Sequence, residues 1–207
     1  MKIISHRGYW HSSEEKNREA AFSRSFDLGF GCETDLRDSG GEIVISHDMA
    51  TGGEVTFEEL LQIMDGRNLP LALNVKADGL AEGMLELLNQ YGHTNYFTFD
   101  MSIPEMVKQT DMHMKVFAPV SDINQTPFLL EKSSGVWLDG FYSIWYDNLV
   151  IEELIGQNLE VCIVSNELHA RPYEGQWSDI RNNKYLGSNK LLICTDKPEE
   201  AAAYFNQ

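Results

Sequence analysis

The sequence has few basic side chains for its length. Lysine and arginine together number 16 against 32 aspartate and glutamate residues, so the formal net charge is −16. Non-specific binding to nucleic acid, or to an anionic membrane surface, requires a basic face. The charge balance therefore excludes both as general partners, and an anionic ligand would have to be attracted locally by a few well-placed cations.

Long apolar runs are also absent, and cysteines are few. No run approaches the roughly 18 apolar residues of a membrane-spanning helix, and the chain starts directly with a predicted strand, which leaves no place for a signal peptide. Cys32, Cys162 and Cys194 each lie in an apolar segment, without the spacing of a metal site. We expect no membrane span and reduced cysteines in a cytoplasmic protein.

Short apolar segments alternate with amphipathic ones, which is typical of parallel strands joined by crossover helices. Hydrophobic residues make up 43% of the chain, and no repeat or linker divides it, so we expect one domain over residues 1–207. The predicted strands cover residues 2–6, 32–36, 70–76, 95–100, 114–120, 136–140, 160–165 and 191–195. The predicted helices cover residues 14–28, 56–64, 79–91, 103–110, 126–132, 147–157, 176–183 and 198–205.

The segment from Gly31 to Met49 concentrates chemically useful groups. Glu33 and Asp35 are two residues apart on a predicted strand, so both carboxylates point to the same face. Gly40-Gly41 predicts a tight turn, and the returning strand ends at His47. Two carboxylates and a histidine suit a metal site with an acid/base group beside it. A solvated surface hairpin would have the same pattern.

The amino terminus adds a second group of this kind. The predicted strand at residues 2–6 runs directly into Arg7 and Gly8, which places the imidazole of His6 and the guanidinium of Arg7 at a strand-to-loop junction. Glycine permits a sharp turn there, and arginine is the side chain best suited to bind a phosphate through paired donors. Alone, His6 fits a structural histidine and Arg7 a surface ion pair.

Together these residues resemble a known signature. His6-Arg7-Gly8, Glu33-x-Asp35 and Gly-Glu-Ile-Val-x-x-His47-Asp48 match the glycerophosphodiester phosphodiesterase family in order and spacing across residues 5–49. The segment 17–22 is loosely similar to the family's Glu-Asn-Thr-x-x-Ala-Phe, although the preceding proline is missing. Residues 71–76 and 194–198 give weaker support, and the insertion that commonly follows the histidine is absent.

This resemblance implies an α/β fold, a single TIM (β/α)8 barrel, and a phosphoric diester hydrolase of lipid metabolism. In such a barrel the reactive groups gather at the carboxyl ends of the strands. Seven residues are expected to meet there: His6 and His47 as acid/base catalysts, Arg7 and Lys76 as phosphate-binding residues, and Glu33, Asp35 and Asn74 as ligands of a divalent ion, Mg²⁺ or Ca²⁺.

Asn74 departs from the family, which has a third carboxylate at this position. An amide oxygen can ligate a hard cation but supplies no charge, so metal affinity should fall unless another acid contributes. Asn74 also fits an ordinary hydrogen-bonded strand residue. The acids that remain available for this role are Asp48, Asp100, Asp139 and Asp196.

Three functions are compatible with these residues. The first is metal-dependent hydrolysis of a small glycerophosphodiester-like substrate by histidine acid/base catalysis, and the second is a non-catalytic phosphate- or phosphodiester-binding barrel weakened at Asn74. The third is a lyase that forms a cyclic phosphate.

An aromatic cluster after the sixth strand is either an apolar wall for the alcohol or a packed loop: Trp137, Phe141, Tyr142, Trp145 and Tyr146. Four histidines without partners at an informative spacing are interpreted as loop or surface residues: His11, His93, His113 and His169.

Overall fold

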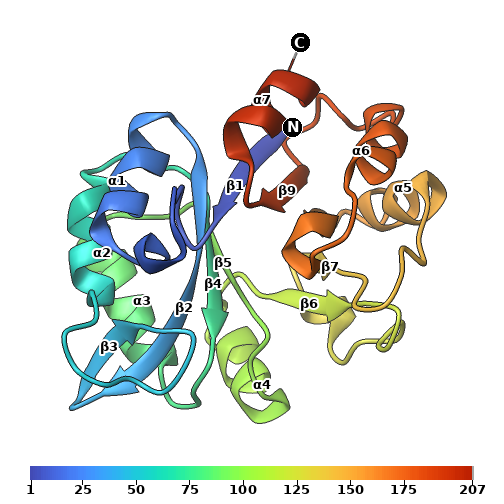
Figure 1. Cartoon of the computed structure of the whole chain (residues 1–207). Coiled ribbons are helices and arrows are strands. Elements are labelled where there is room, and N and C mark those ends of the chain that lie inside the picture. The colour runs from blue at the N-terminus through green and yellow to red at the C-terminus, as the bar shows by residue number, and fades with distance from the viewer. Residues whose placement is uncertain (207) are drawn as a thin grey trace. The chain divides into compact units, whose positions relative to one another are not determined.

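The computed structural model describes residues 1–206, which form two compact units (Figure 1). The first unit comprises residues 5–116, and the second comprises residues 1–4 together with the chain from residue 117 onward. Strand β1 (Lys2–His6) contributes residues to both.

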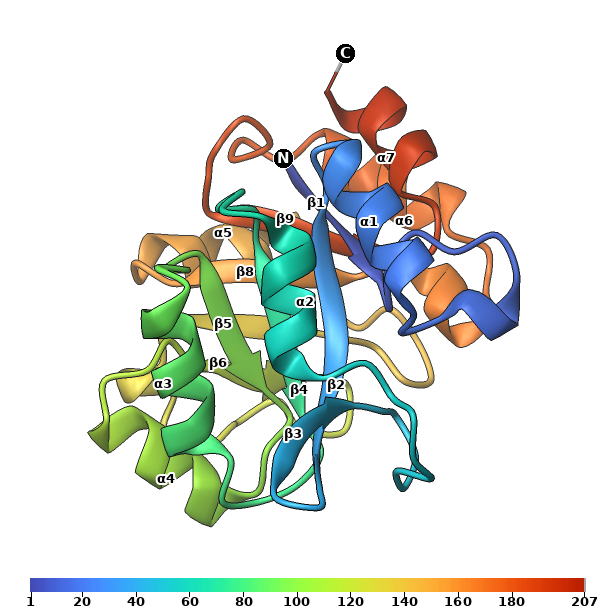
Figure 2. The same ribbon diagram turned by 90° about the vertical axis from the view of Figure 1, so that its left-hand side faces the viewer.

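The first unit alternates strands and helices, as expected. Its remaining strands are β2 (Gly31–Ser39), β3 (Glu42–Ile45), β4 (Leu71–Val75) and β5 (Tyr96–Phe99). Its helices are a short 3-10 turn η1 (Ser13–Glu15), α1 (Glu19–Asp27), α2 (Phe57–Met64), α3 (Ala81–Gln90) and α4 (Ile103–Asp111). Figure 2 shows α2 crossing in front of β2 and β4.

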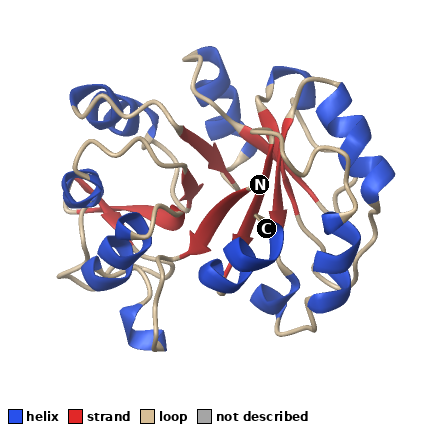
Figure 3. Cartoon of the chain, turned by 90° about the horizontal axis from the view of Figure 1, so that it is seen from above, coloured by secondary structure: helices blue, strands red, loops and turns tan. Residues whose placement is uncertain are grey.

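The second unit continues the same alternation. Its strands are β6 (Phe117–Val120), β7 (Gly135–Leu138), β8 (Glu160–Val164) and β9 (Leu191–Thr195). Its helices are α5 (Asn148–Gly156), α6 (Glu174–Arg181) and α7 (Pro198–Phe205), with short 3-10 turns η2 (Leu130–Lys132) and η3 (Asn166–His169). In each unit the helices lie outside the strands (Figure 3).

The strand order confirms the predicted (β/α)8 barrel fold. It runs β5-β4-β2-β1-β9-β8-β7-β6, with the short strand β3 paired to β2 as an antiparallel hairpin. Neighbouring strands such as β2 and β4, or β7 and β8, are parallel. Within the first unit, Thr98 of β5 also bridges to Val116, just before β6. Sequential parallel strands joined by helices are the architecture of this fold.

One predicted helix is wrong at its start. Residues 14–28 are not one helix, because Asn17 adopts a left-handed φ of 58° between η1 and α1. An α-helix requires right-handed dihedrals throughout, so the chain breaks at Asn17 and α1 begins only at Glu19. The residues before α1 form a separate loop instead, and this loop borders the site described below.

Other local signals act as the sequence predicts. Gly40 and Gly41 have φ of 59° and 91° in the hairpin turn, conformations that glycine adopts without steric cost. Thr56 and Glu59 form a capping box at the start of α2, which satisfies two free backbone N–H groups. After His47, the loop of residues 46–55 leads directly into α2 without an inserted element.

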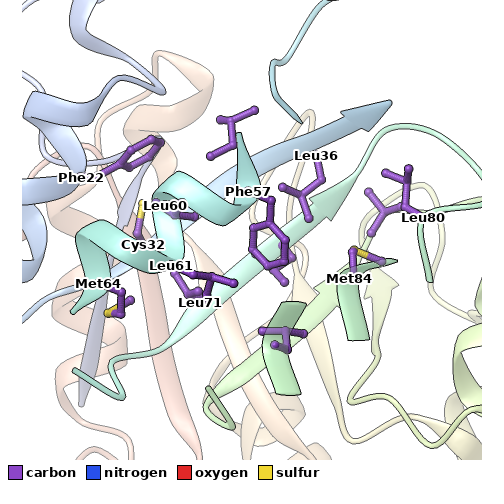
Figure 4. Packing of buried hydrophobic residues seen from close by; sticks show 14 of the residues in the cluster. Phe22, Cys32, Leu36, Phe57, Leu60, Leu61, Met64, Leu71, Leu80 and Met84 are labelled. Atoms are coloured by element: carbon purple, nitrogen blue, oxygen red, sulfur yellow. The ribbon is translucent and has the colours of Figure 1, made fainter. Parts of the chain in front are cut away.

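The core of the first unit lies between α1, α2, α3 and the outer face of β2 and β4. Phe22, Phe57, Leu60, Leu71 and Met84 are fully buried within it (Figure 4). Each such side chain contributes roughly 1.5–3 kcal/mol when removed from water. This packing fixes the strands from which the site residues project.

All three cysteines are free and buried, as predicted, and no helix among residues 1–206 combines the length and apolar character of a membrane span.

Candidate active site

The turn after β1 holds the first two site residues. Arg7 has a left-handed φ of 57° and Gly8 one of 83°. A side chain at Gly8 would place its Cβ 2.7 Å from the Cβ of Ala21, so the turn passes too close to α1 for any residue but glycine. The backbone N–H of Arg7 donates to the Glu33 carbonyl at 2.9 Å and lies 3.2 Å from Glu33 Oε2. The turn is thereby fixed against β2.

Strand β2 supplies two buried carboxylates. Glu33 is 2% exposed and Asp35 is fully buried. Burial raises the pKa of Glu33 well above the usual range of a glutamate, and the neighbouring charge of Asp35 adds to the rise. His6 Nε2 lies 3.9 Å from Glu33 Oε2, and Arg7 Nε lies 3.2 Å from Asp35 Oδ2. The imidazole and guanidinium thus each face one carboxylate.

Asn17 orients the second of these carboxylates. Its Nδ2 donates to Asp35 Oδ2 at 2.9 Å, its Oδ1 accepts from the Thr34 hydroxyl at 2.9 Å, and its backbone N–H donates to the Arg7 carbonyl at 3.0 Å. Asn17 is 8% exposed. Because Asn17 and Arg7 both lie on Oδ2, the other oxygen, Oδ1, is directed elsewhere. Sequence similarity pointed to this segment without assigning a role to Asn17.

Strand β4 brings Asn74 and Lys76 to the free side of Asp35. In the β2–β4 register Asp35 pairs with Asn74, and Lys76 Nζ lies 3.4 Å from Asp35 Oδ1. Asp35 Oδ1, Asn74 Oδ1 and Arg7 Nε are buried and form no hydrogen bond. A buried polar group without a partner costs roughly 1–3 kcal/mol. Two unsatisfied acceptors and one unsatisfied donor side by side are the features of a site that receives a ligand.

His47 is placed by a residue that sequence reasoning missed. Arg37, on β2, donates to the His47 carbonyl through Nε and Nη2 at 3.3 and 3.1 Å, and to the Lys76 carbonyl through Nη1 at 3.4 Å. The His47 ring is half exposed, and its Nδ1 lies 3.0 Å from Asp48 Oδ1. An arginine at a strand end is a common surface residue, so nothing in the sequence singled out Arg37.

The predicted site residues are thus mostly brought together. His6, Arg7, Glu33, Asp35 and Lys76 form a connected set of contacts around the ends of β1 and β4 and the middle of β2, and Asn74 pairs in register with Asp35. His47 makes no direct contact with the two buried carboxylates among the interactions described. It lines the same pocket as Arg7, a cavity of about 360 Å³.

The oxygen atoms around Asp35 include several that could bind a divalent cation. No cluster of three or more His, Cys, Asp or Glu side chains suited to a metal occurs in residues 1–206, and Asn74, paired in register with Asp35, brings an amide rather than a carboxylate. Nevertheless, Asp35 Oδ1 and Asn74 Oδ1 are unsatisfied oxygens, and Glu33 adds a third oxygen donor. Oxygen donors are what Mg²⁺ and Ca²⁺ prefer, so this set fits such an ion, with one negative charge fewer than three carboxylates would give.

The other candidate acids are engaged elsewhere or exposed. Asp48 bonds His47, and Asp100 is exposed. Asp139 and Asp196 belong to the second unit, where Asp139 Oδ1 lies 2.7 Å from His169 Nε2 and the Asp196 N–H donates to Glu167. None of these acids has a described contact with Asp35.

His93 lies in the loop between α3 and β5, as expected, although it is buried at 6% exposure with Nε2 3.2 Å from the Asn95 carbonyl. His169, in η3, has a partner in Asp139. His11 and His113 are exposed, as expected.

The residues of the aromatic cluster differ in burial: Trp137 and Tyr146 are buried, whereas Phe141 and Tyr142 are 48% and 81% exposed.

No family model matches the chain, and no curated protein does. Solved structures do. A glycerophosphodiester phosphodiesterase from Agrobacterium tumefaciens is similar with a TM-score of 0.74 and 17% identity over 100% of both chains. An Oleispira antarctica phosphodiesterase in complex with the product sn-glycerol-3-phosphate gives a TM-score of 0.70 and 16% identity, over 100% of this chain and 97% of the other.

A third structure extends the pattern. A glycerophosphoryl diester phosphodiesterase from Parabacteroides distasonis has a TM-score of 0.63 and 14% identity, with 99% of this chain and 86% of the other covered. At such low identity the similarity concerns the fold, which different chemistries share. The chain therefore has the (β/α)8 fold of these phosphodiesterases, the same family that its sequence motifs resemble.

Proposed function

We propose that this protein is a metal-dependent phosphodiester hydrolase acting on a small glycerophosphodiester-like substrate. The observation that carries the proposal is the set of buried, unsatisfied atoms around Asp35. Arg7 Nε lacks an acceptor, whereas Asp35 Oδ1 and Asn74 Oδ1 lack donors. An anionic phosphodiester beside a divalent cation would satisfy all three at once. The structural similarity to phosphodiesterases supports the same chemistry.

In this proposal the chain's own cations hold the substrate. Arg7 and Lys76 lie on opposite oxygens of Asp35, at 3.2 and 3.4 Å, and contact the non-bridging oxygens of the phosphate. Fixed cations placed where charge develops stabilise the pentacovalent state. Asn17 and Arg37 keep this geometry, the first by holding Asp35 Oδ2 and the second by holding the Lys76 and His47 carbonyls.

The two histidines move the protons. His47 Nδ1 lies 3.0 Å from Asp48 Oδ1, and His6 Nε2 lies 3.9 Å from Glu33 Oε2. One imidazole takes a proton from the attacking water, and the other gives one to the leaving alkoxide, as general acid/base catalysis requires. Glu33, Asp35 and Asn74 would hold the divalent ion, Mg²⁺ or Ca²⁺, which when bound offsets negative charge on the phosphoryl oxygens.

Hydrolysis of glycerophosphocholine and bis(p-nitrophenyl) phosphate with Mg²⁺, Ca²⁺ or Mn²⁺ tests this proposal. We expect turnover that requires the metal and that falls by about 10²–10⁴-fold in His6→Ala. His11→Ala, an exposed histidine five residues away, is the matched control and should keep its rate. Absence of turnover with every metal, or an unchanged rate in His6→Ala, would refute the proposal.

A second function, non-catalytic phosphate binding, is favoured by one specific observation. Arg7 and Lys76 both pair with Asp35, so two fixed positive charges lie beside this buried carboxylate without a metal. Calorimetric titration with glycerol 3-phosphate in EDTA distinguishes the two functions. Tight binding without metal, together with no catalysis until Asn74→Glu supplies a third carboxylate, would support the binding barrel.

Phosphorus NMR of the product separates hydrolysis from formation of a cyclic phosphate.

We also propose that residues 1–207 act as one domain in the cytoplasm. The matched phosphodiesterase structures are covered over nearly their whole length by this chain, and its cysteines are free and buried. A single cooperative transition in urea, followed by fluorescence and circular dichroism together, is the expected result for one domain.

A further inference from the structure

A basic pocket lies beside the reacting groups in the first unit. It has a volume of about 360 Å³, within the range of small-molecule sites. The loop after β1 forms one side, and the loop between β3 and α2 forms the other. Its lining residues with charged side chains are Arg7, Lys16, Arg18, His47, Asp48 and Glu54. Arg7 and His47 belong to the proposed reaction, which leaves Lys16 and Arg18 without a role.

Neither of these two cations is neutralised by an acid. Within residues 1–206, Lys16 and Arg18 form no ion pair with a carboxylate. Lys16 Nζ lies 4.3 Å from the centre of the Trp10 ring, and Arg18 Nη1 donates to the Gly53 carbonyl at 3.4 Å. In a chain with twice as many acids as bases, two uncompensated cations on one small pocket are a specific feature.

The acids around the pocket are occupied. Glu15 bonds Arg24 and the His11 N–H. Glu54 accepts from the backbone N–H groups of Thr51 and Gly52, and Asp48 is engaged by His47. These hydrogen bonds orient Glu54 and Asp48 but leave their charges in place, and the cations Arg7, Lys16 and Arg18 outnumber these two acids among the side chains that line the pocket.

We infer that this basic pocket receives the alcohol portion of the substrate and selects alcohols that carry a second anionic group. The inference rests on the proposed function. A fixed positive field favours an anion and disfavours a quaternary ammonium group such as choline. A choline headgroup usually requires the open face of an aromatic ring, and the nearby Trp10 face is already covered by Lys16.

A matched pair of substrates tests this selection. Glycerophosphoinositol and glycerophosphoinositol 4-phosphate differ only in one phosphate monoester. We expect kcat/KM to be about tenfold higher for the phosphorylated compound, since two part-exposed ion pairs each contribute a fraction of a kcal/mol to about 1 kcal/mol. The preference should shrink between 50 and 500 mM NaCl because salt screens exposed charges.

Variants assign the preference to the two cations. In the Lys16→Gln/Arg18→Gln double variant, kcat/KM of the phosphorylated substrate should fall about tenfold more than that of the unphosphorylated one. Lys108→Gln, at a part-exposed lysine of α4 paired with Glu82, removes a positive charge elsewhere and should leave the ratio as in the wild type. Equal kcat/KM for the two substrates in the wild type overturns the inference and leaves the proposed function intact.

Binding separates this inference from the proposed function. If neither substrate is turned over, the hydrolase proposal fails. The inference about the pocket can still be tested, because calorimetry measures the affinities of inositol 1-phosphate and inositol 1,4-bisphosphate. Equal affinities for these two compounds overturn the inference, and an affinity difference that disappears in the double variant supports it. A short glycerol-phosphate oligomer, compared with glycerophosphoglycerol, distinguishes a second phosphodiester from a phosphate monoester as the anionic group.

Discussion

At the scale of single residues, the two oxygens of Asp35 have different surroundings. Asn17 and Arg7 occupy Oδ2, whereas Oδ1 has only the Lys76 ammonium at 3.4 Å. A carboxylate that is free to rotate would present either oxygen to a ligand. Asn17 therefore determines which oxygen is presented, and this depends on a contact between residues 18 positions apart in the sequence.

Asn17→Gly tests this positioning role. Glycine tolerates the left-handed φ of 58° at this position, so the variant removes the side chain without straining the backbone. We expect a loss of about 2 kcal/mol of stability, since a hydrogen bond to a charged group is removed, and weaker binding of Mg²⁺ and glycerol 3-phosphate in calorimetry. Asn158→Gly, with φ of 71° in the second unit, is the control. Unchanged ligand affinity in Asn17→Gly would contradict the role.

His93 predicts a pH dependence of stability. Burial lowers its pKa below the usual value of histidine, so the unfolded chain binds a proton more readily than the folded one. The stability contributed by the neutral form is complete above about pH 6.5 and is lost as the pH falls below that value. Urea unfolding at pH 7.0 and 5.0 should show a smaller loss in His93→Gln than in the wild type. An equal loss in both would contradict this.

At the scale of elements, the turn between β1 and α1 depends on a close contact. An added Cβ at Gly8 would lie 2.7 Å from Ala21 Cβ and 2.8 Å from the Ala21 carbonyl carbon. The strand and the helix therefore approach as closely as their backbones allow. This approach brings Arg7 into its position against Asp35.

Gly8→Ala should thus cost more than an ordinary glycine substitution. We expect a loss of about 3 kcal/mol from overpacking and an unfavourable φ together, measured by urea unfolding. Gly29→Ala separates the two causes, because Gly29 has a similar φ of 79° but no atom within 4 Å of an added Cβ. It should lose only about 1 kcal/mol. Equal losses in the two variants would show that the contact with Ala21 is not limiting.

Elements were predictable from the sequence where local signals decide them. The closing helix α7 has the predicted bounds of residues 198–205, because Pro198 sets its start and an apolar periodicity follows. Strand β2 is longer than predicted and continues to Ser39, since its pairing with β3 extends it. The break at Asn17 was missed because the residues around it have a helical apolar spacing, and the contacts to Asp35 and Thr34 override that spacing.

The candidate site, too, was predictable from the sequence only in part. His6, Arg7, Glu33, Asp35 and Lys76 were identified from a motif, and the structure brings them into contact. Asn17 and Arg37 act through hydrogen bonds that join distant segments, and single-sequence patterns carry no such information. The chemical roles of all seven predicted residues stay predictions that the experiments above address.

At the scale of the whole molecule, the net charge of −16 opposes compaction through self-repulsion. Added salt should therefore raise the free energy of unfolding. Phosphate at the same ionic strength should raise it further than chloride does, because the buried Arg7 Nε lacks an acceptor. Phosphate at ten times its Kd would add about 1.4 kcal/mol.

The comparison of sodium phosphate with sodium chloride at matched ionic strength, by thermal unfolding, measures this difference. Arg7→Lys keeps the charge but not the guanidinium, and should abolish most of the extra stabilisation by phosphate. Arg67→Lys, at a half-buried arginine paired with Asp27, is the control and should keep it. An identical response of the wild type to both salts would contradict anion binding at Arg7.

The burial of all three native thiols has a practical consequence for spectroscopy. Because Cys32, Cys162 and Cys194 are inaccessible, a thiol introduced at an exposed position would be the one that reacts with a label in the native protein. Met49 is 82% exposed and lines the basic pocket. A fluorophore or spin probe attached to Met49→Cys would thus report ligand arrival directly, in an otherwise unmodified chain.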